Sequence, residues 1–198
     1  WERNHTFPRE ALAELGELGA MGITVPEQWG GAGMDYVSLA LAIEEIAAGH
    51  GAISTIVSVQ NSLACGITLK YGSEAQKKRY LPKLASGEWL GCFCLTEPHT
   101  GSDAATLRTA ARRDGDEWVL NGVKQFITTG QQGQLAIVFA VTDKNAGKKG
   151  ISCFLVPTDA PGYIVARLEE KMGQHASDTA QILFENCRIP ADHLVGQE

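Results

Sequence analysis

Apolar side chains recur with helical spacing through roughly the first 85 residues of the chain. Leu12, Leu15 and Leu18 follow one another at three-residue intervals in the first such segment. Thr6 is a candidate cap for this helix, and Pro8 fits its first turn, where a missing N–H does no harm. The pattern therefore predicts a helix that begins near residue 7.

Two more helices are predicted in this first part. A glycine-rich break, VPEQWGGAG at 25–33, precedes a helix over 36–48. Its apolar positions share one face: Leu39, Ile43, Ile46 and Ala47. Ser73 and Gln76 form a capping-box pattern in front of a helix over 75–84. The uncharged stretch 46–69 contains His50, serines and three glycines, so we expect a buried helix there and no transmembrane span.

The pattern changes near residue 90. Short apolar or alternating segments bounded by turn residues predict strands at 89–95, 118–120, 135–141, 151–156 and 182–184. Asp114-Gly115 and Asn121-Gly122 are two-residue hairpin signals. No long helical pattern interrupts the strands, so a parallel sheet with crossover helices is not expected. The sequence predicts a multi-domain α and β fold: an all-α helical domain over 1–90, followed by an antiparallel β-barrel or sandwich over 91–198.

Composition removes several function classes. The 198 residues carry 17 basic and 23 acidic side chains, a net charge of −6 with no run of five like charges, which argues against nucleic-acid binding. Five cysteines without CxxC spacing predict reduced thiols: Cys65, Cys92, Cys94, Cys153 and Cys187. Five histidines without ligand spacing predict no metal site. The chain starts without a leader sequence, and both ends are expected to be cuts through a longer protein.

Other motifs fail on their context. The glycines at 30, 31 and 33 follow no β-branched strand, so a loop between helices is expected there and not a dinucleotide-binding turn. Ser102 and Asp103 lack a GxSxG elbow, which argues against a hydrolase triad.

Two segments are candidates for binding chemistry. CFCLTEPHTGSD at 92–103 places several hydroxyls and backbone N–H groups in a small space, which suits a phosphate or a flat heteroaromatic ring. The alternative is a polar turn that satisfies its own hydrogen bonds. KQFITTG at 124–130 adds Phe126, Thr128 and Thr129; the aromatic ring fits a cofactor wall and a barrel core equally well.

These two motifs, LTEPHTGSD at 95–103 and KQFITTG at 124–130, resemble the paired flavin-binding motifs of the acyl-CoA dehydrogenase family. The resemblance covers nearly the whole chain in the family's order. It includes VPEQWGGAGMDYVSLALAIEEIA at 25–47, YGSEAQKKRYLPKLASGEW at 71–89 and KMGQHASDTAQILFENCRIP at 171–190. The family's fold is a helical N-terminal domain, a middle β-barrel and a C-terminal four-helix bundle, usually in a tetramer. The chain resembles the first domain, trimmed at its start, together with the barrel; the bundle is missing.

The resemblance implies FAD as cofactor and assigns residues to it. The flavin contacts would come from Phe93, Cys94, Leu95, Thr96, Gly101, Ser102, Phe126, Ile127 and Thr128. Ser102 and Lys148 would contact the coenzyme A part of the substrate, although a solvated hairpin tip is the plain alternative for Lys148. Phe126 replaces a tryptophan common in the family, and His175 stands where many members have arginine.

The implied reaction is oxidation of an acyl-CoA thioester to a trans-2-enoyl-CoA. A carboxylate removes the α proton, hydride passes to FAD, and electrons continue to an electron-transfer flavoprotein. The family's base lies in the missing bundle, so no catalytic residue is expected in this chain, and the chain alone should bind FAD weakly. The resemblance also implies a role in fatty acid or branched-chain amino acid catabolism, in a bacterial cytoplasm or a mitochondrial matrix. An acyl-CoA oxidase or other flavoenzyme on the same scaffold, or a non-catalytic flavin- or CoA-binding module, remains the alternative.

Overall fold

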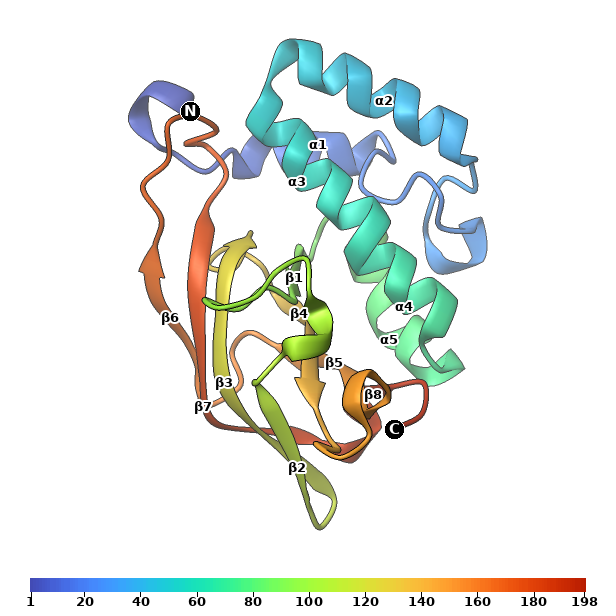
Figure 1. The fold of residues 1–198 in the computed structure, drawn as a ribbon. Coiled ribbons are helices and arrows are strands. Elements are labelled where there is room, and N and C mark those ends of the chain that lie inside the picture. The colour runs from blue at the N-terminus through green and yellow to red at the C-terminus, as the bar shows by residue number, and fades with distance from the viewer.

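The first half of the chain is helical in the computed structural model, which describes residues 1–198 (Figure 1). Three separate helices are α1 (Arg9–Glu17), α2 (Tyr36–Gly49) and α5 (Glu74–Ala85). One nearly continuous helix between α2 and α5 consists of α3 (Gly51–Val59), a π-helical segment (Gln60–Cys65) and α4 (Gly66–Tyr71). Short 3-10 helices lie at Glu2–Asn4 and Glu27–Trp29. The predicted helices over 36–48 and 75–84 are confirmed.

The predicted caps have different outcomes. At α5, Ser73 Oγ accepts from Gln76 N at 3.2 Å and Ser73 N donates to Gln76 Oε1 at 2.9 Å, so the capping box is confirmed. At α1 the predicted cap is wrong. Pro8 occupies the cap position, and the Thr6 hydroxyl donates to Asn4 O instead. Thr6 lies too far ahead of the first turn to reach its free N–H groups.

The apolar face predicted for α2 is only partly buried. Leu39 is buried, Ile43 and Ile46 are half-buried against the helical core, and Ala47 is exposed. α2 lies at the outside of the helical layer (Figure 1), so much of its apolar surface is uncovered in this chain. Exposed large side chains on and beside it are Met34, Tyr36, Val37 and Leu41.

The second half is one curled eight-stranded sheet. Its strands are β1 (Gly91–Cys94), β2 (Ala110–Asp114), β3 (Glu117–Thr128), β4 (Leu135–Val141), β5 (Ile151–Pro157), β6 (Tyr163–Leu168), β7 (Thr179–Pro190) and β8 (Leu194–Val195). The order is β6-β7-β3-β2-β4-β5-β8, with β1 beside β4. Further 3-10 helices lie at Ala104–Thr106, Gly147–Gly150 and Ala191–His193. The predicted helical domain followed by a β domain is confirmed.

The sheet is not purely antiparallel, which corrects the prediction. β1 pairs with β4 in parallel from Gly91↔Leu135 to Cys94↔Val138, and β2 meets β4 in parallel at Ala110↔Val141. Parallel neighbours need a long connection, and the β2–β3 hairpin lies within the connection from β1 to β4. The remaining strand pairs are antiparallel.

One predicted hairpin is confirmed and the other is wrong. β2 and β3 turn around Gly115, which has φ 64°, between the paired residues Asp114 and Glu117. Asn121-Gly122 instead lies inside β3, at a bulge opposite β7. Gly122 has φ 152°, and a Cβ there would lie 2.4 Å from Thr109 Oγ1. The glycine is needed for a close approach and not for a turn.

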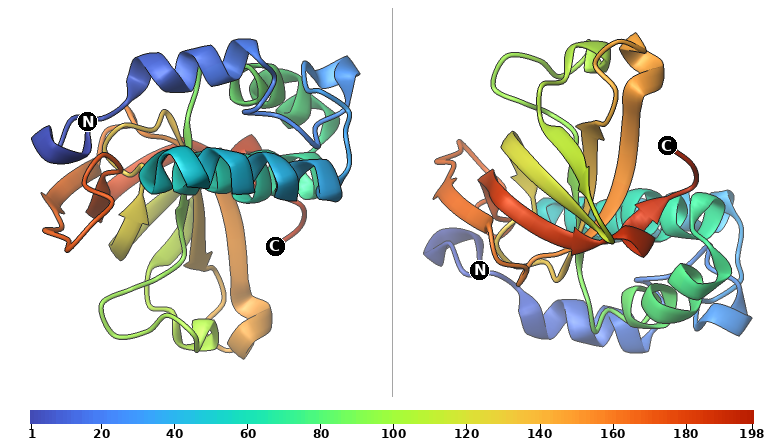
Figure 2. Two further views of the ribbon diagram at one scale, coloured as in Figure 1. Left: turned by 90° about the horizontal axis from the view of Figure 1, so that it is seen from above. Right: turned by 90° about the horizontal axis from the view of Figure 1, so that it is seen from below.

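The helical layer lies against the sheet (Figure 2), and one hydrophobic cluster contains residues of both. Leu81 and Leu84 of α5 pack in the same cluster as Leu135 and Ile137 of β4. A second cluster fills the inside of the curled sheet around Trp118, Phe154 and Phe184. The shared core fixes where β1 leaves the helical half, and the loop after β1 carries the first binding motif.

The helix Gly51–Tyr71 is long and apolar enough, by length and composition, to cross a membrane. In this fold 56% of its apolar window is buried. Two polar side chains inside it are buried and bonded: Gln60 Nε2 donates to Leu84 O at 2.7 Å, and Asn61 Oδ1 accepts from Ile23 N at 2.7 Å. These bonds support a core helix, and the absence of a membrane span stays a prediction.

Candidate functional site

The fold brings the two motifs side by side. The loop after β1 and the end of β3 are joined by a backbone bond from Gln125 N to Thr96 O at 2.8 Å. Lys124 Nζ adds a bond to Leu95 O at 2.9 Å. Residues about thirty positions apart therefore line one site, as the pairing of the motifs predicts.

A buried ion pair that we did not predict lies beneath this junction. Lys124 Nζ is 2.9 Å from Glu97 Oε1, and the two side chains are 0% and 2% exposed. The carboxylate also accepts Arg108 N at 2.8 Å and Thr109 N at 2.9 Å. Burial acts to raise the pKa of Glu97, but the bonds from Thr109, Lys124 and Arg108 outweigh it and lower that pKa. The Glu97 carboxylate is therefore ionised at neutral pH, and both of its oxygens accept hydrogen bonds.

A bulge in β3 turns Phe126 out of the sheet. The register against β7 shifts between Lys124 and Ile127, so one extra residue lies on β3. Phe126 has φ 59° and is 62% exposed, whereas Ile127 is 2% exposed in the sheet core. The alternative that Phe126 fills the barrel core is therefore wrong. A large aromatic held at positive φ on the surface is a costly arrangement, and such positions cluster at functional sites.

Three hydroxyls predicted to bind are left without partners. Thr96, Ser102 and Thr128 make no side-chain hydrogen bond within the chain, and none of these hydroxyls is sealed from solvent. Their neighbours differ: Thr100 Oγ1 donates to Asp103 O at 2.6 Å, and Thr106 Oγ1 donates to Thr100 Oγ1 at 2.9 Å. The loop thus satisfies its own turn with one set of hydroxyls and leaves the other set available to a ligand.

The remaining predicted residues differ in what they offer. Cys94 is 0% exposed, and like the other four cysteines it is free, as predicted. Phe93 packs against Phe139 with ring centroids 5.3 Å apart. Leu95 is half-buried, and Gly101 is exposed, with its added Cβ position 3.7 Å from Thr96 Cγ2. A ligand would therefore contact mainly backbone atoms in the first part of the 92–103 motif and side chains in its second part.

Lys148 lies near the same loop. It is exposed on the 3-10 helix Gly147–Gly150, which contacts the 3-10 helix Ala104–Thr106. Both short helices project from the same end of the sheet, on the side away from the helical layer (Figure 2). The structure therefore places the lysine beside the loop that carries Ser102.

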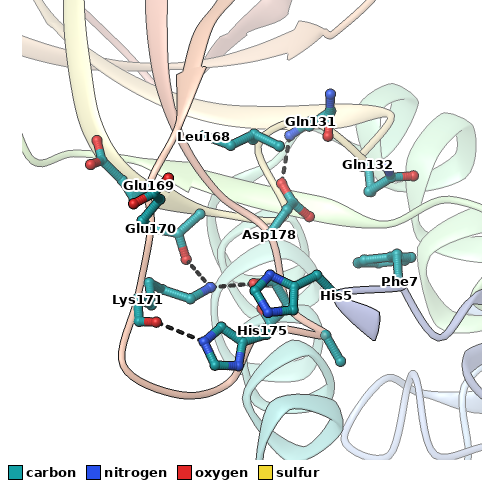
Figure 3. Close-up of a pocket in the computed structure, with 13 residues that line it drawn as sticks. His5, Phe7, Gln131, Gln132, Leu168, Glu169, Glu170, Lys171, His175 and Asp178 are labelled. Atoms are coloured by element: carbon teal, nitrogen blue, oxygen red, sulfur yellow. Dashed lines mark hydrogen bonds between the residues drawn. The ribbon is translucent and has the colours of Figure 1, made fainter. Parts of the chain in front are cut away.

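A cavity lies just beyond the second motif. It has a volume of about 560 Å³ between the N-terminal segment and the ends of β3, β6 and β7 (Figure 3). His5 and His175 stack on each other in its lining, with ring centroids 4.2 Å apart. Gln131 and Gln132 line it directly after KQFITTG, and Asp178 Oδ2 accepts Gln131 N at 2.8 Å. No group of three His, Cys, Asp or Glu side chains is arranged to hold a metal ion, and the absence of a metal stays a prediction.

Asp178 is a destabilised carboxylate in this wall. Its Oδ1 is buried without a hydrogen-bond partner, and burial raises the pKa of the side chain. The folded state then holds its proton to higher pH than the unfolded state, so stability falls as pH rises through the raised pKa. We expect Asp178→Asn to increase the free energy of unfolding by about 1 kcal/mol at pH 7 and by less at low pH.

Urea unfolding at several pH values measures this effect. Asp143→Asn is the matched control, because exposed Asp143 also accepts a backbone N–H, from Asn145 at 2.8 Å. The control should change stability little at any pH. If Asp178→Asn increases the free energy of unfolding by the same amount at every pH, the charge of the buried carboxylate is not the cause of the destabilisation.

Comparison with known proteins agrees with the geometry. Residues 1–88 match the family model "Acyl-CoA dehydrogenase, N-terminal domain", and residues 92–187 match "Acyl-CoA dehydrogenase, middle domain". The human mitochondrial short-chain specific acyl-CoA dehydrogenase is 45% identical over 99% of this chain and 48% of its own length.

Two solved structures are also similar. A chain from work on the electron transferring flavoprotein of Acidaminococcus fermentans superposes with a TM-score of 0.97 at 40% identity, over 100% of this chain and 52% of its own. A glutaryl-CoA dehydrogenase from Mycobacterium smegmatis in complex with FADH2 gives a TM-score of 0.91 at 42% identity, over 99% of this chain and 49% of its own.

The chain spans about half the length of the relatives that it matches. The two family models together account for nearly all of its residues, in the order helical domain then sheet. The chain belongs to the acyl-CoA dehydrogenase family.

Proposed function

We propose that this chain holds FAD for the α,β-dehydrogenation of an acyl-CoA thioester, with the flavin between the 95–103 loop and the 126–128 end of β3. The observation that carries the proposal is the set of three unpartnered hydroxyls, on Thr96, Ser102 and Thr128, beside the exposed ring of Phe126. A flat ring with several acceptor atoms matches hydroxyl donors next to an aromatic face.

The residues of the site would bind different parts of the cofactor and the substrate. Thr96 and Thr128 would donate hydrogen bonds to the ring, and Phe126 would cover one of its faces. Gly101 and Ser102 would contact the phosphates, and Ser102 and Lys148 would also contact the coenzyme A arm. Phe93, Cys94 and Ile127 would contribute backbone, since their side chains pack inside the protein. Bound FAD supplies the hydride acceptor of the reaction.

The proton-abstracting base would come from outside residues 1–198. The one carboxylate buried at the junction, Glu97, is held by Lys124 and two backbone N–H groups, so it is not free to take a proton from a substrate. The unmatched half of the relatives leaves room for such a base.

Membership of the family supports proposals for the partners and the setting. An electron-transfer flavoprotein is the proposed electron acceptor, and a homotetramer the proposed assembly. The proposed setting is a bacterial cytoplasm or a mitochondrial matrix, in fatty acid or branched-chain amino acid catabolism. We also propose the domain division 1–90 and 91–198, supported by the end of α5 at Ala85 and the start of β1 at Gly91. No nucleic acid or membrane partner is proposed.

An anaerobic absorbance titration tests the function. FAD is added to the chain until its visible spectrum shows protein-bound flavin, and butyryl-CoA is then added. We expect bound flavin that stays oxidised. An unperturbed FAD spectrum at millimolar protein would contradict the site, and bleaching would place the base within these residues. In the full-length protein, oxygen consumption during turnover would instead indicate an oxidase.

The hydroxyls can be tested one at a time. We expect Thr128→Val and Ser102→Ala each to weaken FAD binding by about fivefold, the loss of one hydrogen bond worth about 1 kcal/mol. Ser86→Ala is the matched control, because Ser86 Oγ bonds only within its own helix end, to Lys83 O and Glu88 N. Calorimetric titration gives the dissociation constants, and equal losses in all three variants would count against the assignment.

A further inference from the structure

The Glu97–Lys124 pair differs from the other ion pairs of the chain. Both of its side chains are buried, whereas every other Lys or Arg pair keeps at least one partner exposed to solvent. Desolvating two charges offsets most of their attraction, so a buried pair adds little net stability over apolar residues of the same size. Stability alone therefore does not account for this pair.

The pair is connected to the backbone at both ends of one loop. Lys124 Nζ donates to Leu95 O at the start of the loop and to Glu97 Oε1. The Glu97 carboxylate accepts Arg108 N and Thr109 N, where the loop returns to the sheet. Lys124 thus holds the beginning of the segment 95–109 directly and its end through Glu97.

The same lysine is close to the second wall of the site. Lys124 lies two residues before Phe126 and four before Thr128, on the strand that bulges outward. Next to it, Gln125 N donates to Thr96 O at 2.8 Å. The carbonyl groups of Leu95 and Thr96 are both held toward β3, while the Thr96 hydroxyl has no partner within the chain.

We propose that Glu97 and Lys124 are positioning residues that fix the 95–103 loop relative to Phe126 and Thr128, so that both walls of the flavin site are formed before the flavin binds. The proposal rests on the proposed FAD site. A preformed site avoids the ordering of a mobile loop on binding, which is a direct gain in affinity. Loss of the pair should therefore change the affinity and environment of the flavin more than it changes the fold.

The test uses the full-length protein that carries these residues and two variants. Glu97→Gln/Lys124→Met removes both charges and leaves side chains of similar size, so it should fold. Glu97→Gln keeps an oxygen that can accept from the loop N–H groups. Calorimetry gives the FAD dissociation constant, and visible circular dichroism reports the asymmetry around the bound ring. We expect about tenfold weaker binding and an altered dichroism band in the double variant, with a smaller change in the single one.

Asn61→Leu serves as the control, because it removes buried bonds to Ile23 N and Ala20 O that lie within the helical half, away from both motifs. It should lower thermal stability without altering the dichroism of bound flavin at a temperature where it is folded. If the double variant folds and binds FAD like the wild type, the positioning role is overturned. If it does not fold, an unchanged affinity and dichroism in Glu97→Gln overturns it. Failure of the wild-type protein itself to bind FAD would overturn the proposed function, and this role with it.

Discussion

Replacing Lys124 with methionine is expected to lower the free energy of unfolding by about 3–5 kcal/mol, because it leaves Glu97 charged, buried and without its counter-ion. The two side chains are 0% and 2% exposed, so water cannot take the place of the lost ammonium. The backbone N–H groups of Arg108 and Thr109 would still bind the carboxylate, but they carry no net charge.

Urea denaturation followed by tryptophan fluorescence measures the loss. The sign of its pH dependence is fixed by Glu97, whose pKa is lowered in the wild type. A lowered pKa contributes stability above the ordinary carboxyl pKa that is lost as pH falls. Lys124→Met removes one of the interactions that lower this pKa, so the carboxyl should take up a proton at a higher pH than in the wild type. The stability deficit of the variant should therefore narrow as pH falls.

Two further variants make the result specific. Glu97→Gln/Lys124→Met should recover much of the loss, since neither charge remains. Arg188→Met removes a pair of solvent-exposed contacts, to Asp114 at 2.8 Å and Glu117 at 2.7 Å, and should change stability far less than Lys124→Met does. A Lys124→Met deficit no larger than that of the surface variant would contradict the buried-pair account.

The parts of the fold that could be predicted are those decided within a few residues. The Ser73–Gln76 capping box and the turn at Gly115 each depend on atoms at most three residues apart, and both formed as expected. Helix and strand types follow the spacing of apolar residues for the same reason, because both periods are local properties.

Features decided by distant contacts could not be predicted. Asn121-Gly122 has the same turn chemistry as Asp114-Gly115, but it lies inside β3 where the pairing with β7 shifts by one residue, and its glycine accommodates the close approach of Thr109. Phe126 was equally consistent with core and surface, since one extra residue in β3 reverses the side to which a side chain points.

In the candidate site, too, local features were predictable and distant contacts were not. Both motifs were recognisable, and the structure places them together, with Thr96, Ser102 and Thr128 free. Glu97 and Lys124 lie inside those motifs, 27 positions apart, yet nothing in their spacing shows that they pair. The two motifs were expected to lie together, and each contains a charged residue of opposite sign. That combination was the signal from which the pair could have been predicted.

Gln60→Leu is expected to lower the free energy of unfolding by about 2–5 kcal/mol. Gln60 Nε2 donates to Leu84 O at 2.7 Å and to Trp89 O at 2.8 Å, and its Oε1 accepts Gly91 N at 2.8 Å. Leucine fills a similar volume but leaves Trp89 O and Gly91 N without a partner, each at a cost of about 1–3 kcal/mol when water cannot reach it. Leu84 O keeps one bond, from Gly87 N at 3.1 Å. Because the bonds connect the end of α5 to the start of β1, the loss should loosen the crossing between helices and sheet.

Two comparisons separate hydrogen bonding from packing. Gln28→Leu, at an exposed position, should change stability by less than about 0.5 kcal/mol. Gln60→Glu keeps the shape and, once protonated, can still accept from Gly91 N and donate one O–H. The loss of unfolding free energy in Gln60→Glu should therefore shrink as pH falls and the glutamate becomes protonated. The loss in Gln60→Leu should not change in this way, because leucine does not titrate. If the two variants are equally destabilised at every pH, Gln60 acts through its packing, and the hydrogen bonds across the crossing contribute little.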